Sequence, residues 1–341
     1  MAKYSRTVKV AILCCLWYTL SSANNVIGKK ALRKYPYPLT ISLFHMTANA
    51  FLMYPILMVM GKEYSFHYSM AFFWRFVLPL GFGKLLASVS SHISIWKVSV
   101  SYAHTIKASL PIFTVTLSRI LYHEKQSQMV YLSLIPIVFG VCIATMTEIS
   151  FEIIGMLSAL FATATFSVQN IYSKLALKEV RLNPIQLLMK ISQTALIICI
   201  PLWLFVDTPT IVTDDRLANF EDQIDFLFRL LVSGLINWLQ NILAFSILNL
   251  LSPLSYSVAN ATKRILVIIS SVLTLKNPVT MTNFFGMMLA VLGVFLYNRA
   301  KIFQNSKKNL LPKTTKDVAA GGEEEQYVST RYRVFHRMNG I

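Results

Sequence analysis

The chain has little charge, and this scarcity excludes most classes of soluble protein. Of its 341 residues only 14% are charged and 55% are hydrophobic, whereas about 25% charged residues is usual for a soluble domain. A transmembrane helix needs about 20 apolar residues, so about ten spans would use about 200 residues and leave short loops and one tail. The composition therefore predicts a multi-span membrane protein and excludes a soluble enzyme.

Motifs that carry chemistry are also missing. The four cysteines lie inside apolar runs, so the sequence indicates no disulfide, zinc site or redox motif. It contains no hydrolase motif, glycine-rich phosphate loop or pair of buried carboxylates. The formal net charge is +17, yet no basic cluster outside the apolar runs is interleaved with aromatic residues. We therefore expect no catalytic residue, no metal, no cofactor and no nucleic-acid partner.

Apolar runs predict an all-α integral membrane protein with ten transmembrane helices. The predicted spans are 10–28, 39–60, 76–93, 98–118, 129–147, 153–173, 184–206, 230–249, 254–275 and 279–298. The first run resembles a secretory signal but lacks a cleavage site of small residues, so we interpret it as an uncleaved span. Residues 300–341 are polar and low in apolar content, which predicts a disordered cytosolic tail.

The two halves of the chain resemble each other. SYAHTIKASLPIF in the fourth span is similar to SYSVANATKRILVII in the ninth, and Lys107 and Lys263 are each the tenth residue of their predicted span. Because five is an odd number, a second half of five spans must enter the membrane from the opposite face. We therefore expect two five-helix repeats, 1–149 and 150–299, in the inverted arrangement typical of alternating-access transporters.

The distribution of basic residues predicts that both termini are cytosolic. With a cytosolic amino terminus, the inner side carries 14 Lys or Arg residues near the span ends and the outer side carries 8, leaving out the distal tail. Against this orientation, Lys29, Lys30, Arg33 and Lys34 would all lie outside. We recognise no Arg-rich, Ser-rich leader for a plastid or mitochondrion, so we expect the Golgi or endoplasmic reticulum membrane.

Positive side chains inside the predicted spans are the main functional signal. Lys84, Lys107, Lys190, Lys263 and Arg264 fall inside spans, whereas all 15 acidic residues fall in loops or the tail. A Lys or Arg near a helix centre costs about 2.5–3.5 kcal/mol, and Lys107 and Lys263 lie about 15 Å deep. We interpret Lys84 and Lys190 as close enough to a span end to reach an interface. The other cations predict a wet, positively charged cavity whose counter-ion is an anionic substrate.

Phosphate suits these cations better than carboxylate does. Arg presents a planar fork to phosphate oxygens and Lys supplies a compact charge, so the adjacent Lys263 and Arg264 could hold one phosphate from two sides. Asn260 lies one turn earlier on the same face and could bind sugar hydroxyls. His104 lies one turn before Lys107, where either a packing role or a ligand-binding role fits.

Three stretches resemble a known family. SVSYAHTIKASLPIF (99–113), YLSLIPIVFGV (131–141) and SPLSYSVANATKRILVI (252–268) resemble the triose-phosphate translocators of the drug/metabolite transporter superfamily. The similarity runs from about residue 8 to 300 and is particularly marked for subfamily E of solute carrier family 35. The resemblance implies a ten-helix, five-plus-five inverted repeat that exchanges organic phosphates for inorganic phosphate.

The resemblance also implies particular site residues. The phosphate would be held by Lys107, Lys263 and Arg264, with Ser91 as a hydroxyl residue of the third span and Lys29 or Lys30 at the end of the first. A histidine of the plant translocators is replaced by Ser88, and a tyrosine that contacts the organic part of the substrate is replaced by Gln240. The phosphate half of the site is therefore retained, whereas triose phosphate itself is not implied as the substrate.

Three functions remain open from the sequence. The leading hypothesis is a secondary-active antiporter that moves a phosphorylated small metabolite across a lipid bilayer, with inorganic phosphate as the candidate counter-substrate. The first alternative is a nucleotide-sugar transporter of the Golgi or endoplasmic reticulum. The second, of another class, is a membrane adaptor or receptor that no longer transports and has no need of Lys263 and Arg264. An anion channel is disfavoured because no repeated ring of charge is evident.

Overall fold

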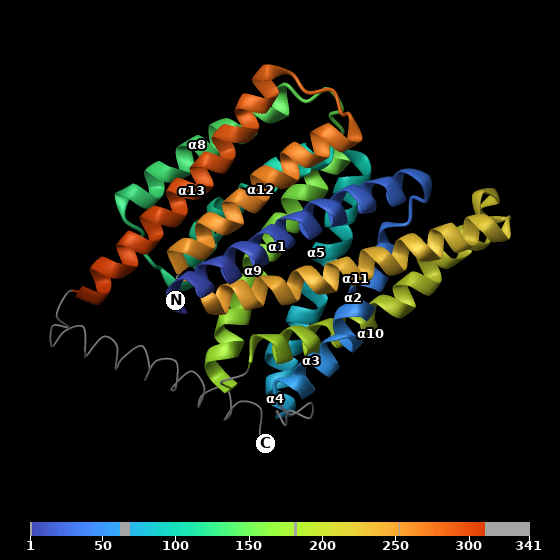
Figure 1. Cartoon of the computed structure of the whole chain (residues 1–341), viewed down its shortest axis with the longest axis horizontal. Helices are drawn as coiled ribbons and strands as arrows, with labels where there is room; N and C mark the ends of the chain where they lie inside the picture. Colours follow the sequence, from blue (N-terminus) through green and yellow to red (C-terminus); the bar gives the residue numbers. More distant parts are fainter. Residues whose placement is uncertain (1, 62–68, 181–182, 252, 311–341) are drawn as a thin grey trace. The chain divides into compact units, whose positions relative to one another are not determined.

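The structure of the chain is a computed structural model that describes all residues except 1, 62–68, 181–182, 252 and 311–341. Every regular element in this described part is a helix (Figure 1). Residues up to Arg299 form one compact unit that contains all the predicted spans. The predicted tail begins with the last turns of a helix that ends at Leu310, and the rest of it lies outside the described residues.

The helices follow the predicted spans in order. They are α1 (Ala2–Lys34), α2 (Pro38–Phe51), α3 (Met53–Val59), α4 (Met70–Phe72), the π-helical turn η1 (Phe73–Val77), α5 (Leu78–Lys97), α6 (Val100–Lys107), α7 (Leu110–Tyr122), α8 (Gln128–Met146), α9 (Ile153–Val180), α10 (Pro184–Val212), the 3₁₀ turn η2 (Asp215–Leu217), α11 (Phe220–Leu250), α12 (Pro253–Leu275) and α13 (Met281–Leu310). Among the described residues, nine helical segments are long and apolar enough to cross a membrane. The remaining predicted span, 98–118, is divided between α6 and α7.

The fourth span is broken where Lys107 ends α6. Ala108 and Ser109 donate their backbone N–H groups to the carbonyls of Thr105 and Ile106, at 3.0 and 2.9 Å, in the tighter pattern of a 3₁₀ turn. Pro111 has no N–H with which to continue the ladder to the carbonyl of Lys107. The proline two residues into α7 therefore places a helix break beside the cation, which hydropathy alone does not reveal.

The third span is longer than predicted. The prediction was 76–93, but α4, η1 and α5 together run from Met70 to Lys97. The added first turns are rich in aromatic residues, and Phe72 and Phe76 pack on each other with ring centroids 5.2 Å apart. Lys84 consequently lies in the middle of the span and not near its end. Its interpretation as an interfacial lysine was wrong.

Acidic residues are also found inside helices, contrary to the prediction that all of them lie in loops or the tail. The helix α10 continues past the predicted end at 206 to Val212, and Asp207 is buried within it at 6% exposure. Its Oδ2 accepts hydrogen bonds from the backbone N–H and the Oγ1 hydroxyl of Thr40, at 2.9 and 2.6 Å. Asp207 therefore caps the first turn of α2 from another helix, which accounts for a carboxylate at this depth.

A second acidic group lies at the start of α11, which begins at Phe220 and not at 230. Asp222 and Asp225 both form ion pairs with Lys34 at the end of α1, at 3.0 Å, and Asp225 also pairs with Arg229. The end of α1 and the start of α11 are thereby joined on one side of the molecule. None of these acids pairs with the cations of the fourth or ninth span.

Contacts between helices follow a two-fold pattern. The helix α1 packs on α11 and α12, and α9 correspondingly packs on α5 and α7. Similarly, α2 packs on α11, and α10 packs on α5. If each span of the first half is matched with the span five places later, each of these contacts has an equivalent in the other half. The contacts between α2 and α10 and between α6 and α12 each join two matched spans, so they are their own equivalents. This symmetry is what a five-plus-five inverted repeat requires.

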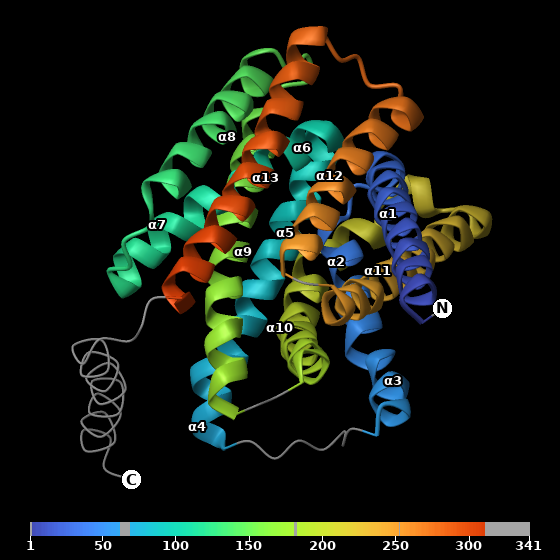
Figure 2. The same ribbon diagram turned by 60° about the vertical axis from the view of Figure 1, so that its left-hand side comes forward.

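The fifth and tenth spans pack closely through small residues. A Cβ atom on Gly140 of α8 would lie 2.3 Å from the backbone nitrogen of Ala290, and one on Gly286 of α13 would lie 2.8 Å from that of Ala144. Only glycine permits this approach, which is typical of helix pairs in membranes. Figures 1 and 2 both show α8 and α13 side by side. This pair too maps onto itself under the exchange of halves.

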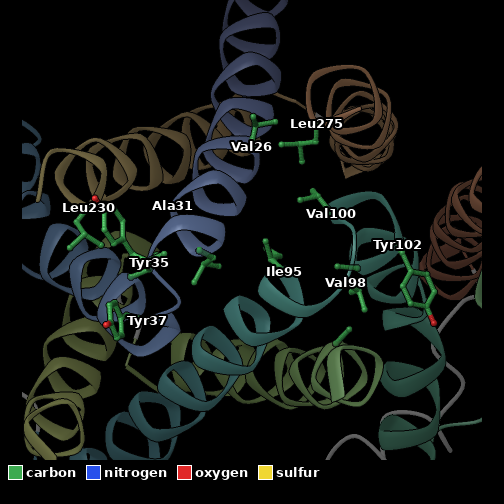
Figure 3. Packing of buried hydrophobic residues seen from close by; sticks show 14 of the residues in the cluster. Val26, Ala31, Tyr35, Tyr37, Ile95, Val98, Val100, Tyr102, Leu230 and Leu275 are labelled. Atoms are coloured by element: carbon green, nitrogen blue, oxygen red, sulfur yellow. The ribbon is translucent and has the colours of Figure 1, made fainter. Parts of the chain in front are cut away.

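The largest apolar cluster joins helices of both halves. It includes Val26 and Ala31 of α1, Ile95 of α5, Val100 of α6 and Leu275 of α12, among others. Figure 3 shows Ile95 pointing from α5 toward the α1 side of the cluster, with Val98 and Val100 beside it at the junction of α5 and α6. This packing fixes α6, and therefore Lys107, against α1 and α12.

Candidate functional site

Lys107 ends α6 and contacts the third span. Its Nζ donates a hydrogen bond of 2.6 Å to the hydroxyl of Ser91 on α5. Both side chains are partly buried. The structure therefore brings together two residues that the resemblance assigned to phosphate binding, one from α5 and one from α6.

The two cations of α12 lie in different surroundings. The Nζ of Lys263 lies 4.3 Å from the ring centroid of Trp17 on α1, a cation–π contact, and Trp17 stacks on Tyr256 with centroids 5.8 Å apart. Arg264 points toward α6, where its Nη1 donates to the backbone carbonyl of His104 at 3.4 Å. The ring of Trp17 partly compensates the charge of Lys263, and the carbonyl of His104 partly compensates that of Arg264. Neither of these groups is an anion.

Lys107 on α6 and the pair Lys263 and Arg264 on α12 belong to helices that pack on each other, and we call these three residues the cation cluster. The charges of Arg264 and Lys107 both act on Lys263, and the charge of Arg264 acts on Lys107. None of the ion pairs in the described part of the chain includes any of the three. The cluster draws one cation from the first half of the fold and two from the second, so it lies where the halves meet.

His104 acts through hydrogen bonds between helices. Its Nε2 lies 2.8 Å from Oδ1 of Asn25 on α1, and the amide nitrogen of Asn25 donates to the carbonyl of Ser21. Because that amide oxygen can only accept, Nε2 carries the proton of this bond. The backbone of His104 receives Arg264, while its ring holds α6 to α1. This arrangement fits the packing role of the two that the sequence left open.

Asn260 and Gln240 are not brought into contact with the cation cluster. Both side chains are partly buried, Asn260 on α12 and Gln240 on α11. The described contacts include none between either amide and the three cations. Their part in binding an organic group stays a prediction.

Lys29 has a structural environment. It is buried at 5% exposure, and its Nζ donates to the carbonyls of Ile95, Trp96 and Val98 at 2.7, 2.9 and 2.8 Å. These carbonyls belong to the end of α5 and the residue that follows it, where helical partners run out. All three ammonium donors are therefore used to cap α5, whereas Lys30 is exposed. Neither lysine joins the cation cluster in this structure.

A buried polar layer beside the cluster was not predicted as a unit. His92 and Ser42 share a hydrogen bond of 2.7 Å, His45 and Ser233 share one of 2.8 Å, and the two imidazole rings lie edge to face at 4.9 Å. The layer continues through an amide cluster in which Asn49 bonds to Asn237 and Asn241. The sequence pattern that could have predicted this layer is the spacing of its polar residues, which recur every three or four positions along α2 and α11.

The model of a family described as the Triose-phosphate Transporter family matches residues 8–298. Among the described residues, no group of three or more His, Cys, Asp or Glu side chains could hold a metal ion.

Curated relatives carry names of phosphate translocators. Glucose-6-phosphate/phosphate translocator 1, chloroplastic, from Arabidopsis thaliana is 31% identical over 87% of this chain and 76% of its own. Phosphoenolpyruvate/phosphate translocator 2, chloroplastic, from the same plant is 34% identical over 85% of this chain and 76% of its own. Its Xylulose 5-phosphate/phosphate translocator, chloroplastic, is 33% identical over 87% and 72%.

Solved structures share the fold, and one of them serves as an example. This crystal structure of a protein superposes with a TM-score of 0.50 at 12% sequence identity, covering 89% of this chain and 98% of the other. At that identity the likeness concerns the arrangement of the helices alone.

Proposed function

Since this chain belongs to the Triose-phosphate Transporter family, we propose that it is an antiporter that exchanges a phosphorylated small metabolite for inorganic phosphate by alternating access. It is a multi-pass membrane protein. The relatives that match most of its length are named for exchanging different phosphorylated metabolites, with phosphate as the shared partner. We therefore propose that this chain shares with these relatives the recognition of the phosphate group of the substrate.

The observation that carries the proposal is the cation cluster. Three cations inside the membrane amount to an insertion cost on the order of 10 kcal/mol, and the described ion pairs include no acid that offsets it. A phosphate dianion would neutralise two of the charges. Arg264 can hold two of its oxygens with its planar fork, while Lys107 and Lys263 supply point charges.

The position of the cluster supports alternating access. Lys107 comes from the first half of the fold and Lys263 and Arg264 come from the second, so a bound phosphate would bridge the halves. When one half rocks against the other, the same phosphate becomes accessible from the other face. Binding and release suffice for this cycle, and no covalent step is assigned to any residue, so we propose a transporter and not an enzyme.

Counterflow in proteoliposomes tests the proposal. Vesicles containing the purified protein and preloaded with inorganic phosphate should take up labelled phosphate at least about tenfold faster than empty proteoliposomes, because an antiporter returns only when it carries a counter-substrate. Protein-free liposomes, loaded and empty, serve as the controls. Equal uptake by loaded and empty proteoliposomes would mean that the protein does not exchange phosphate.

We further propose that both termini face the cytosol. The count of Lys and Arg residues near the span ends, 14 on the inner side against 8 on the outer side, supports this orientation.

A topology experiment separates the two orientations. Tags at each end should be reached by antibody in cells whose plasma membrane alone is permeabilised, whereas a tag after Thr213 should be reached only when internal membranes are also opened. The opposite pattern would invert the orientation. Location in the Golgi or endoplasmic reticulum stays a prediction of the sequence, and the same cells test it by co-localisation with organelle markers.

A further inference from the structure

A fourth cation, Lys84, lies at mid-membrane depth and has no part in the cation cluster. The third span runs from Met70 to Lys97, so Lys84 lies fourteen residues after its start and thirteen before its end. At 1.5 Å per residue each end is about 20 Å away. A lysine stem cannot cover that distance to reach an interface. Lys84 therefore has the same unfavourable position as the cations of the cluster.

Lys84 is on the inner face of α5. Phe82, two residues earlier and so about 200° away around the helix, is 50% exposed and marks the lipid-facing side. Ser91 lies seven residues after Lys84, which returns to within about 20° of the same direction. Since Ser91 bonds to Lys107, the face that carries Lys84 is the face that reaches the cation cluster. Ser88 lies between them on this face.

Among the residues that the structure describes, no acidic side chain pairs with Lys84. No hydrogen bond or ion pair joins Lys84 to another residue that the structure describes. Its charge acts on His45, which is already bonded to Ser233 and packed against His92. In turn, the charge of Lys107 acts on His92. The charges of Lys84 and Lys107 therefore act on the two members of one packed histidine pair.

We propose that Lys84 is a second anion-binding position in the transport site, which receives an anionic group at the end of the metabolite away from its phosphate. This inference rests on the proposed phosphate exchange and adds the substrate class. Lys84 and Ser91 are separated by about 10 Å along the helix axis, and the flexible four-carbon stem of lysine adjusts the distance of its ammonium to the bound molecule. The favoured metabolites are phosphorylated acids and bisphosphates, and phosphates with a neutral far end are disfavoured.

Two matched pairs of substrates test this class. 3-Phosphoglycerate and glycerol 3-phosphate share three carbons, a phosphate and the 2-hydroxyl, and differ in a carboxylate against a CH₂OH group. Fructose 1,6-bisphosphate has a second phosphate that fructose 6-phosphate lacks. Its two anionic groups lie further apart than the phosphate and carboxylate of 3-phosphoglycerate. In proteoliposomes preloaded with inorganic phosphate, we expect the wild type to prefer the doubly anionic member of at least one pair by about tenfold or more in Vmax/KM.

The variants then assign that preference to one side chain. Lys84→Gln should bring the preference within about twofold while leaving phosphate–phosphate exchange nearly unchanged, because inorganic phosphate does not reach Lys84. Lys84→Arg should keep the preference, since the charge is retained. Lys174→Gln, at an exposed position on α9, controls for the loss of a lysine elsewhere.

Each outcome separates this inference from the proposed function. If the wild type exchanges phosphate but shows no preference in either pair, or if Lys84→Gln keeps the preference, the second position is wrong and the antiporter stands. If Lys84→Gln lowers exchange of phosphate and of all four metabolites equally, Lys84 has a structural role and the inference is also wrong. If the wild type does not exchange phosphate at all, both proposals fail.

Discussion

Arg264→Gln should lower phosphate exchange by about a hundredfold or more, the largest effect that we expect from any single substitution in the chain. Removing one partner from a desolvated, hydrogen-bonded charge pair costs about 2–5 kcal/mol. Arg264 is the residue of the cation cluster whose planar fork can hold two phosphate oxygens at once. Glutamine retains a hydrogen-bonding amide of moderate length but removes the charge. Uptake of labelled phosphate into phosphate-loaded proteoliposomes measures the loss.

Companion variants show whether charge or geometry is decisive. Arg264→Lys keeps the charge but loses the fork, so we expect an intermediate loss of exchange. Lys125→Gln, at an exposed position, should leave exchange unaffected and serves as the matched loss of a surface cation. Exchange by Arg264→Gln at the wild-type rate, in protein inserted at the same level, would remove the central support for phosphate binding. The adaptor alternative predicts that result.

Lys29→Met should destabilise the fold while leaving the phosphate affinity of the remaining folded protein close to that of the wild type. The substitution keeps an apolar stem but leaves the carbonyls of Ile95, Trp96 and Val98 without their charged donor. Unsatisfied buried acceptors cost about 1–3 kcal/mol each, so we expect a loss of about 3 kcal/mol or more. At about 2–4 °C per kcal/mol for a large domain, the apparent Tm in detergent should fall by about 6 °C or more.

The neighbouring lysine provides the control for stability. Lys30 is exposed, so Lys30→Met should change the free energy of unfolding by no more than about 0.5 kcal/mol. The family resemblance gives the contrary expectation, in which one of these lysines contacts substrate. If Lys29→Met protein keeps the wild-type Tm and its KM for phosphate rises strongly, Lys29 binds substrate in another state of the cycle and the capping role is secondary.

Hydropathy was sufficient to locate the spans because lipid imposes the same length and composition on every crossing helix. Hydropathy did not give the depth of Lys84 within its span, because the aromatic first turns of the third span begin six residues before the predicted start. Hydropathy also placed Asp207 in a loop, whereas this residue lies inside α10, which continues as a helix through Pro209. In both cases a boundary error of a few residues changed the interpreted depth of a charge.

The site was predictable where it depends on local pattern and unpredictable where it depends on distant partners. The cations were visible because a charge in an apolar run has few explanations. By contrast, the carbonyls that cap Lys29 lie 66 or more residues further along the chain, and Trp17 lies far from Lys263 in sequence. Nothing in a single sequence indicates that one lysine will meet carbonyls, another an aromatic ring and a third a serine.

The ammonium of Lys29 fastens α1 to the end of α5, and this attachment restricts how the molecule can change shape. A movement of α1 alone would break the three hydrogen bonds that the Lys29 ammonium donates, so we expect α1 and the end of α5 to move as one unit. We expect bending at a joint outside this unit, such as residues 108–109 between α6 and α7. This joint directly follows Lys107, so bending there would move α7 while α6 and Lys107 stay packed against α1 and α12.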